Sequence, residues 1–247
     1  MQKLASGNIS RTEAVLRLDG VYKSFTSHRV LDNINLHLAA GEVYAMLGPN
    51  GAGKTTTLNL ILGFTAPDAG HIEVAGIDAV RAPLAARAKL AYLPETVMLH
   101  PVLSAVDNLK YFALLGGRHL SSTEAHRLLI DAGLQEPAFE LRAGGFSKGM
   151  RQKVGLAIAL AKNAQLLLLD EPTSGLDARA ANEFAHLVRT ASTRNLAVLM
   201  VTHDLFRIRD TAHRLGILHG GKLVAERHTA ELSSIDIESL YLEQLGV

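Results

Sequence analysis

The sequence predicts an α/β fold built around a parallel sheet, and two stretches carry this prediction. Residues 42–47 read as a strand buried on both faces. After a glycine-rich segment, residues 55–62 form a proline-free stretch with helical apolar periodicity. Residues 165–169 are a second continuous apolar run, typical of a strand that helices cover on both faces of a sheet. In open α/β sheets, ligand-binding residues follow the carboxyl ends of such strands.

The segment after the first strand fits the pattern G-x-x-x-x-G-K-[ST]. It reads Gly48, Pro49, Asn50, Gly51, Ala52, Gly53, Lys54 and Thr55, and Thr56 follows it in the predicted helix. Glycines let backbone N–H groups approach a triphosphate closely, and the helix N-terminus adds a positive partial charge. Lys54 would reach the β- and γ-phosphates as a catalytic group, and the Thr55 hydroxyl would ligate Mg²⁺. The nine residues therefore predict a nucleotide-binding site, with a flexible glycine turn as the alternative.

Asp170 and Glu171 stand at the carboxyl end of the second strand. Asp170 would hold Mg²⁺ directly or through water, and Glu171 would polarise the water that attacks the γ-phosphorus. An acidic pair after a strand can also be a solvated turn or a helix cap. Together with the glycine loop, however, the pair favours ATP hydrolysis.

Two further motifs narrow the class. The first is Phe146-Ser147-Lys148-Gly149-Met150 before a predicted helix over 151–162, and the second is Pro172-Thr173-Ser174-Gly175-Leu176-Asp177, followed by a strand over 197–202 that ends at His203. In this order, from residue 15 to about 224, the motifs resemble the ATP-binding cassette (ABC) family. The resemblance implies a P-loop ATPase fold over 15–247 with a RecA-like core, an N-terminal antiparallel β subdomain and an inserted helical subdomain at about 94–163. Residues 1–14 would be a flexible extension.

Ser147 and Gly149 place a hydroxyl and an uncrowded backbone at a helix N-terminus, which is a second potential anion site. Taken alone, Ser147 is more simply a helix cap. The resemblance implies that two subunits pair head to tail, so that each ATP lies between one glycine loop and the partner's Ser147 and Gly149. Asp177 would belong to the loop that crosses this interface, while also capping a helix over 178–191.

The resemblance assigns two more residues to the nucleotide. His203 would contact the γ-phosphate and orient the attacking water beside Glu171, although a lone histidine after a strand is commonly just a polar strand end. An aromatic ring near the N-terminus would stack on adenine. The alignment favours Phe25 for this role, with Tyr22 as the alternative, and either ring could instead be an ordinary apolar anchor.

The sequence departs from the family pattern at two places. After the predicted strand over 90–93, Glu95 stands where many members carry glutamine, and it replaces an amide by a group that only accepts hydrogen bonds. Glu95 would face Mg²⁺ as a metal ligand, or mainly connect the site to a partner. In the signature, which usually reads L-S-G-G-Q, Lys148 replaces a glycine and Met150 replaces the glutamine. Lys148 could add positive charge near the partner's nucleotide or lie in solvent.

The combination of Tyr92-Leu93-Pro94-Glu95 with the signature is similar to the ATPase subunits of bacterial exporters whose permease is a separate chain. This resemblance implies an ATPase on the cytoplasmic face of the membrane, paired with a second copy or a paralogue and with a permease. Residues 96–115 would carry the docking surface, unless they are only a linker into the helix over 104–115. The alternatives are an ABC ATPase that acts on ribosomes or DNA without a permease, and a P-loop kinase.

Global properties agree with this reading. Lys and Arg number 25 against 24 Asp and Glu, so nothing indicates nucleic-acid binding, and the chain has no cysteine. No apolar run approaches the ~20 residues of a membrane-spanning helix. The last elements expected are strands over 215–218 and 222–224 and an amphipathic helix over 236–245 that packs on the core.

Overall fold

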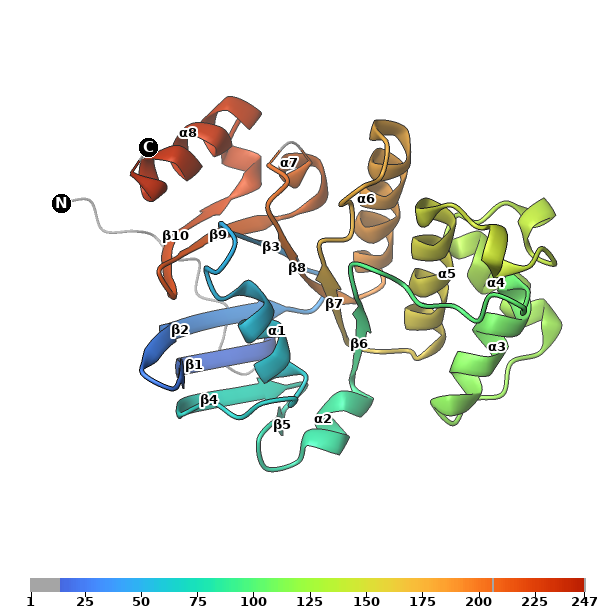
Figure 1. Ribbon diagram of the computed structural model, residues 1–247, viewed down its shortest axis with the longest axis horizontal. Coiled ribbons are helices and arrows are strands. Elements are labelled where there is room, and N and C mark those ends of the chain that lie inside the picture. Colours follow the sequence, from blue (N-terminus) through green and yellow to red (C-terminus); the bar gives the residue numbers. More distant parts are fainter. Residues whose placement is uncertain (1–13, 206, 247) are drawn as a thin grey trace.

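The computed structural model describes residues 14–205 and 207–246. The described residues form two sheets with helices around them, and several helices gather at one end of the molecule (Figure 1). The predicted extension over 1–14 lies outside the described residues, apart from Ala14, which begins the first strand.

The larger sheet has six strands and carries the predicted strands of the core. In spatial order they are β10 (Lys222–His228), β9 (Arg214–His219), β3 (Val43–Leu47), β8 (Ala197–Thr202), β7 (Leu166–Asp170) and β6 (Leu90–Leu93). All neighbours pair in parallel except β10, which runs antiparallel to β9. Leu47 pairs with Thr202 and Asp170 pairs with Val201, so the carboxyl ends of β3, β7 and β8 meet at one edge. The residues that follow these strands are therefore brought together.

The smaller sheet is antiparallel and lies beside the larger one (Figure 1). Its strands, in spatial order, are β2 (His28–Ala39), β1 (Ala14–Phe25), β4 (Ala69–Val74) and β5 (Ile77–Asp78). Sequence periodicity does not predict the full length of the first two strands. The pairing of β1 with β2 contains several register shifts, which break the regular alternation that would have marked the full strands.

Helices flank the larger sheet and fill the far end of the molecule (Figure 1). They are α1 (Lys54–Ile61), α2 (Pro83–Ala88), α3 (Ala105–Leu115), α4 (Ser122–Asp131), α5 (Lys148–Ala161), α6 (Ala178–Ser192), α7 (Ile208–Thr211) and α8 (Ser234–Leu245), with short 3₁₀ turns at Glu136–Ala138, Ala143–Gly145 and Thr229–Glu231. Side-chain caps mark several of their starts, because Ser104, Ser121 and Asp177 each accept a hydrogen bond from a backbone N–H in the first turn. Helix α5 begins at Lys148, three residues before the predicted start at 151.

Two apolar cores enclose the larger sheet, one on each face. In β7, Leu167 and Leu169 pack into the core on the side of α5 and α6, whereas Leu166 and Leu168 pack on the side of α1 and the smaller sheet. Strand β3 alternates in the same way between the two cores. Each buried leucine contributes about 1.5–3 kcal/mol by leaving water. The strands that deliver the polar residues are thus held from both faces.

A buried polar contact joins β3 to the antiparallel end of the larger sheet. The Tyr44 hydroxyl donates a hydrogen bond to Glu226 Oε1 at 3.0 Å, and the guanidinium of Arg214 lies 5.0 Å from the centre of the Tyr44 ring. Burial, reinforced by the Glu226 carboxylate, raises the pKa of Tyr44 well above its ordinary value, so the phenol stays a donor. The ring passes directly over Gly216, where a Cβ atom would lie only 1.9 Å from the hydroxyl oxygen.

We expect Gly216→Val to lower the free energy of unfolding by about 3 kcal/mol, because the new side chain overpacks the site and displaces Tyr44. Urea denaturation followed by circular dichroism measures the change. Gly145→Ala is the matched control, since no atom lies within 4 Å of the position that its Cβ would take. Equal stability of the two variants would contradict the packing described for Tyr44.

Across residues 14–205 and 207–246, no helix combines the length and the apolar character that crossing a membrane requires.

Candidate nucleotide site

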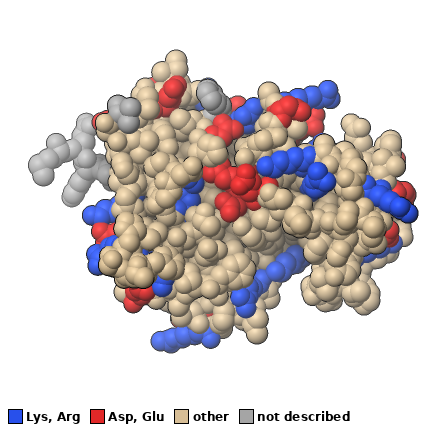
Figure 2. All heavy atoms as spheres, in the orientation of Figure 1, with Lys and Arg blue, Asp and Glu red and all other residues tan. Residues whose placement is uncertain are grey.

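A cleft of about 530 Å³ lies at the carboxyl edge of the larger sheet. Its lining brings together the glycine loop and residues from three other parts of the chain: His28, Val30, Pro49, Asn50, Gly51, Ala52, Gly53, Lys54, Thr55, Thr56, Glu95, Asp170 and Glu171. Acidic side chains gather near the middle of the face seen in Figure 2, and basic side chains stand beside them toward the helical end. His28 and Val30 of β2 were not expected in this lining, since only the fold brings β2 over the loop.

The glycine loop has a left-handed backbone at two positions, which strongly favours glycine. Gly53 has φ +111°, and a Cβ atom there would lie 2.6 Å from Leu31 Cδ2. Gly51 has φ +80°, with no atom within 4 Å of the corresponding position. The first turn of α1 contains no acidic residue and no side-chain cap. Loop and helix therefore present an open, uncrowded N-terminus that fits a polyphosphate.

Lys54 is anchored across this loop. Its Nζ donates hydrogen bonds to Gly48 O at 2.6 Å and to Pro49 O at 3.2 Å, and it lies 4.0 Å from Glu171 Oε1. The side chain is only 8% exposed. Burial lowers the pKa of Lys54, and the carboxylates of Glu171 and Asp170 oppose that shift. The structure thus places a buried cation beside the acidic pair.

Asp170 is oriented by a residue from the neighbouring strand. The Tyr92 hydroxyl donates a hydrogen bond to Asp170 Oδ2 at 3.1 Å. Burial, together with the Asp170 carboxylate, raises the pKa of Tyr92 to about 12, so the phenol remains a donor. Burial also raises the pKa of Asp170; the hydrogen bond from Tyr92 opposes this shift, and the charges of Glu171 and Glu95 add to it. This role of Tyr92 is not visible in the sequence, because the contact depends on the register of β6 against β7.

Glu171 and His203 meet at the ends of β7 and β8. Glu171 has φ +44°, a left-handed conformation that is uncommon outside glycine and is typical of functional sites. Its Oε1 lies 2.9 Å from His203 Nδ1, and its Oε2 accepts a hydrogen bond from the backbone N–H of His203 at 3.2 Å. The Glu171 side chain is largely buried, whereas the His203 ring is mostly exposed. The carboxylate is therefore held in place while the ring can reach a ligand.

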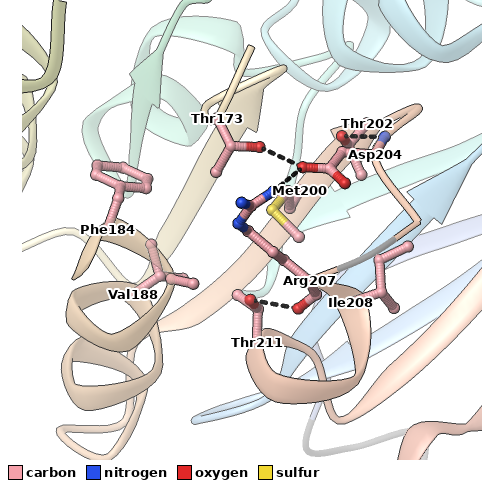
Figure 3. A pocket seen from close by; sticks show the side chains of 10 residues that line it. Thr173, Phe184, Val188, Met200, Thr202, Asp204, Arg207, Ile208 and Thr211 are labelled. Carbon is pink, nitrogen blue, oxygen red and sulfur yellow. Dashed lines mark hydrogen bonds and ion pairs between the residues drawn. The ribbon is translucent and has the colours of Figure 1, made fainter. Parts of the chain in front are cut away.

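The loop that carries His203 is tied to α6 and to the segment after Glu171 (Figure 3). Asp204 Oδ2 accepts hydrogen bonds from Arg207 Nη1 at 2.9 Å and from Thr173 Oγ1 at 3.4 Å. Arg207 Nε donates in turn to Asn182 Oδ1 at 3.1 Å. Thr173, Asp204 and Arg207 border a small pocket of about 10 Å³, whose apolar wall includes Phe184 and Val188. The network fixes the loop against α6 and the segment around Thr173.

Ser147, Gly149 and Asp177 are not among the described residues that line the cleft. Ser147 caps α5 by accepting a hydrogen bond from Met150 N at 3.2 Å, and Asp177 caps α6 by accepting one from Ala180 N at 2.8 Å. A Cβ atom on Gly149 would lie 3.5 Å from Ala180 Cβ, so the starts of α5 and α6 are neighbours. Ser147, Gly149 and Asp177 therefore lie apart from the cleft within one chain, and a second anion site at Ser147 and Gly149 stays a prediction.

Neither candidate for stacking on adenine lines the cleft in the described part of the chain. Phe25 ends β1 and is 48% exposed, with Lys23 Nζ 5.3 Å from its ring centre. Tyr22 is half-buried, and Arg29 lies 5.7 Å from its ring centre. The exposed ring of Phe25 is free to stack on a flat ligand, and its assignment stays a prediction.

Glu95 stands at the border between the cleft and α5. Its Oε1 accepts a hydrogen bond from Ser174 Oγ at 2.9 Å and lies 3.9 Å from Lys148 Nζ. Its backbone oxygen accepts a hydrogen bond from Nε2 of the buried Gln152 at 3.2 Å. Glu95 is thus bound to neighbours in its own chain while it also lines the cleft.

Comparisons with known proteins point to one family. The ABC transporter family model matches residues 31–174. The Nod factor export ATP-binding protein I of Paraburkholderia xenovorans is 33% identical over 95% of this chain and 77% of its own length. A solved ATP-binding subunit of an ABC transporter superposes with a TM-score of 0.80 at 29% identity, over 94% of this chain and 99% of the other. A dimeric ATP-binding cassette in a post-hydrolysis state, bound to ADP and phosphate, gives 0.76 at 26% identity over 87% and 98%.

The chain belongs to the ABC transporter family. It has the predicted α/β fold of an ABC ATPase, and it is an ATP-binding subunit with ATPase activity.

Proposed function

We propose that this chain is the ATP-hydrolysing subunit of a bacterial exporter and works on a separate membrane permease from the cytoplasmic face of the membrane. One observation carries the proposal: Lys54, Asp170, Glu171 and the glycine loop share one cleft, while Ser147 and Gly149 form a second surface outside it. The Nod factor relative supports export by its name. A role on ribosomes or DNA without a permease is not favoured, because the relatives are transporter subunits.

The hydroxyl of Thr55 and the carboxylate of Asp170 are the ligands offered to Mg²⁺, which is commonly held by one or two protein oxygens together with phosphates. Mg²⁺, when bound with ATP, neutralises phosphate charge during the transfer. Tyr92 holds the Asp170 carboxylate toward the cleft by its hydrogen bond. Glu95 is the remaining candidate ligand, in competition with its bonds to Ser174 and Lys148.

Glu171 is the base that polarises the attacking water, and His203 orients that water and contacts the γ-phosphate. The 2.9 Å separation between His203 Nδ1 and Glu171 Oε1 lets the two groups act on the same water molecule. Lys54 stabilises the charge that develops on the phosphates, because its ammonium is buried where charge interactions are strong.

Two copies of this chain, or one copy and a paralogue, close around two ATP molecules. Each nucleotide binds the glycine loop of one subunit and the Ser147–Gly149 surface of the other, with Asp177 at the interface and Phe25 on the adenine. Closure requires that the closed dimer bind ATP better than the open one, since a ligand shifts an equilibrium only by such a difference. Hydrolysis removes that preference, and the dimer reopens.

Residues 96–115 carry the docking surface for the permease. Met98 is 77% exposed, Val102 is 71% exposed and Leu115 is 67% exposed, and all three lie in this segment. Large exposed apolar side chains close together in the sequence favour a contact with another protein. The core behind the segment is firm, because Asn108 is fully buried and bonds the backbone of His100 in both directions.

We expect Ser147→Arg to abolish ATP-dependent dimerisation and to reduce ATPase activity at least tenfold, while ATP binding to the isolated chain changes by no more than about twofold. The bulky cation would stand where the partner's nucleotide must approach. Size-exclusion chromatography with Mg-ATP, equilibrium binding and phosphate release measure the three quantities.

Ser121→Arg is the matched control, because it makes the same substitution at the N-cap of α4 and costs a similar cap energy of about 1 kcal/mol. Full cooperative ATPase activity in Ser147→Arg would refute a nucleotide site shared between subunits.

A further inference from the structure

Lys148 is the first residue of α5, a position where a positive charge is unfavourable. The unpaired N–H groups at a helix N-terminus carry a positive partial charge, which attracts anions and repels cations. The first turn of α5 contains no acidic residue that could compensate. An anion beside Lys148, from elsewhere in the fold or from a ligand, is therefore stabilising.

In this structure Glu95 supplies that anion. Its Oε1 lies 3.9 Å from Lys148 Nζ, and the hydroxyl of Ser174 holds the same oxygen at 2.9 Å. The ammonium also lies close to the tight turn at Gly175, where a Cβ atom would be 3.5 Å from Nζ. Glu95 also contacts α5 through its backbone oxygen, which accepts a hydrogen bond from the side chain of Gln152 in that helix.

The same Glu95 faces the nucleotide cleft of its own chain. It lines that cleft with Asp170 and Glu171, and its negative charge contributes to raising the pKa of Asp170. A triphosphate in the cleft brings several negative charges toward this carboxylate. Nucleotide in the cleft therefore acts on the Glu95 end of this ion pair, and the N-terminus of α5 acts on the Lys148 end.

We propose that Glu95 and Lys148 form an intrachain latch that holds the N-terminus of α5 in the open subunit and releases Lys148 to the partner's nucleotide phosphates when the dimer closes. The proposal rests on the shared nucleotide site above and specifies its regulation. The physical basis is an exchange of anions, since a phosphate carries more charge than one carboxylate and suits the same helix N-terminus. Glu95 then acts as a positioning residue through Lys148.

The test measures the Mg-ATP concentration for half-maximal dimerisation in a Glu171→Gln chain, because slow hydrolysis is expected to make its dimers long-lived. Glu95→Gln keeps an acceptor for Ser174 but removes the charge, so we expect the midpoint to fall about three- to fivefold. A metal-binding role for Glu95 predicts the opposite, a higher midpoint. A midpoint that rises or stays unchanged overturns the latch.

Lys148→Met completes a double-mutant cycle. The single variant loses the latch, which lowers the midpoint, and the phosphate contact, which raises it. Its midpoint therefore rises only modestly. In the Glu95→Gln background only the phosphate contact remains to be lost, so the rise is about three- to fivefold larger. Lys148→Arg retains the positive charge, so its midpoint should equal that of the parent. Additive effects in the cycle contradict the coupling.

Lys153→Met and Glu183→Gln are the matched controls, because these residues form a pair on α5 and α6 at 3.0 Å, outside the cleft. Their midpoints should equal that of the parent, and thermal unfolding without nucleotide should show that all the variants are folded. Complete failure of the Glu171→Gln chain to dimerise at any Mg-ATP concentration would refute the shared site itself. Dimerisation that ignores Glu95 and Lys148 would refute the latch alone.

Discussion

Replacing Glu171 by glutamine is expected to slow ATP hydrolysis by about 10²–10⁴-fold and to leave ATP binding intact, because the amide cannot accept the proton of the attacking water. The substitution keeps the size of the side chain and an oxygen that can accept the hydrogen bond from the backbone N–H of His203. Single-turnover phosphate release and equilibrium ATP binding separate the two effects.

The same variant should accumulate a stable dimer with Mg-ATP, since a closed pair that cannot hydrolyse ATP has no route to reopen. Size-exclusion chromatography with multi-angle light scattering detects this species, and ADP in place of ATP should leave the chain monomeric. Glu42→Gln is a suitable control, because Glu42 is a largely buried carboxylate that contacts Arg214 Nε at 3.1 Å, away from the cleft. Wild-type turnover in Glu171→Gln would remove Glu171 as the catalytic base.

Replacing Lys54 by alanine is expected to lower turnover by about 10²–10³-fold and to weaken ATP binding at least tenfold. The variant removes the buried ammonium that faces the phosphate-binding loop, and it leaves the carbonyl oxygens of Gly48 and Pro49 without that donor. The carboxylates that remain in the cleft, those of Glu95, Asp170 and Glu171, then repel the nucleotide. Fluorescent-nucleotide titration and steady-state phosphate release measure the two losses.

Lys162→Ala is the matched control for this change. Lys162 also donates to a backbone carbonyl, that of Arg87 at 2.8 Å, and burial likewise lowers its pKa, but it stands at the end of α5. Its loss should leave binding and turnover unchanged. Unaltered affinity and rate in Lys54→Ala would contradict the position of the phosphates assigned to the glycine loop.

Local patterns explain why the core strands and the nucleotide loop could be predicted. The strands over 197–202 and 90–93 occur at the predicted positions. In an α/β protein, a short continuous apolar run between turn residues is typical of a buried strand. The strands of the smaller sheet were harder to recognise. Ala69–Val74 contains two glycine or alanine positions at its start, and the bulges between β1 and β2 interrupt the alternation that periodicity requires.

The sequence by itself determined the glycine loop, the acidic pair after β7, and the family, because each depends on residues adjacent in the chain. Only the tertiary structure decided how these groups are held. Tyr92 reaches Asp170, Thr173 reaches Asp204, and Lys148 reaches Glu95 through the register of a sheet or the packing of a helix. Contacts between distant positions are selected by packing and leave no periodic pattern behind, so they become visible only when the chain is folded.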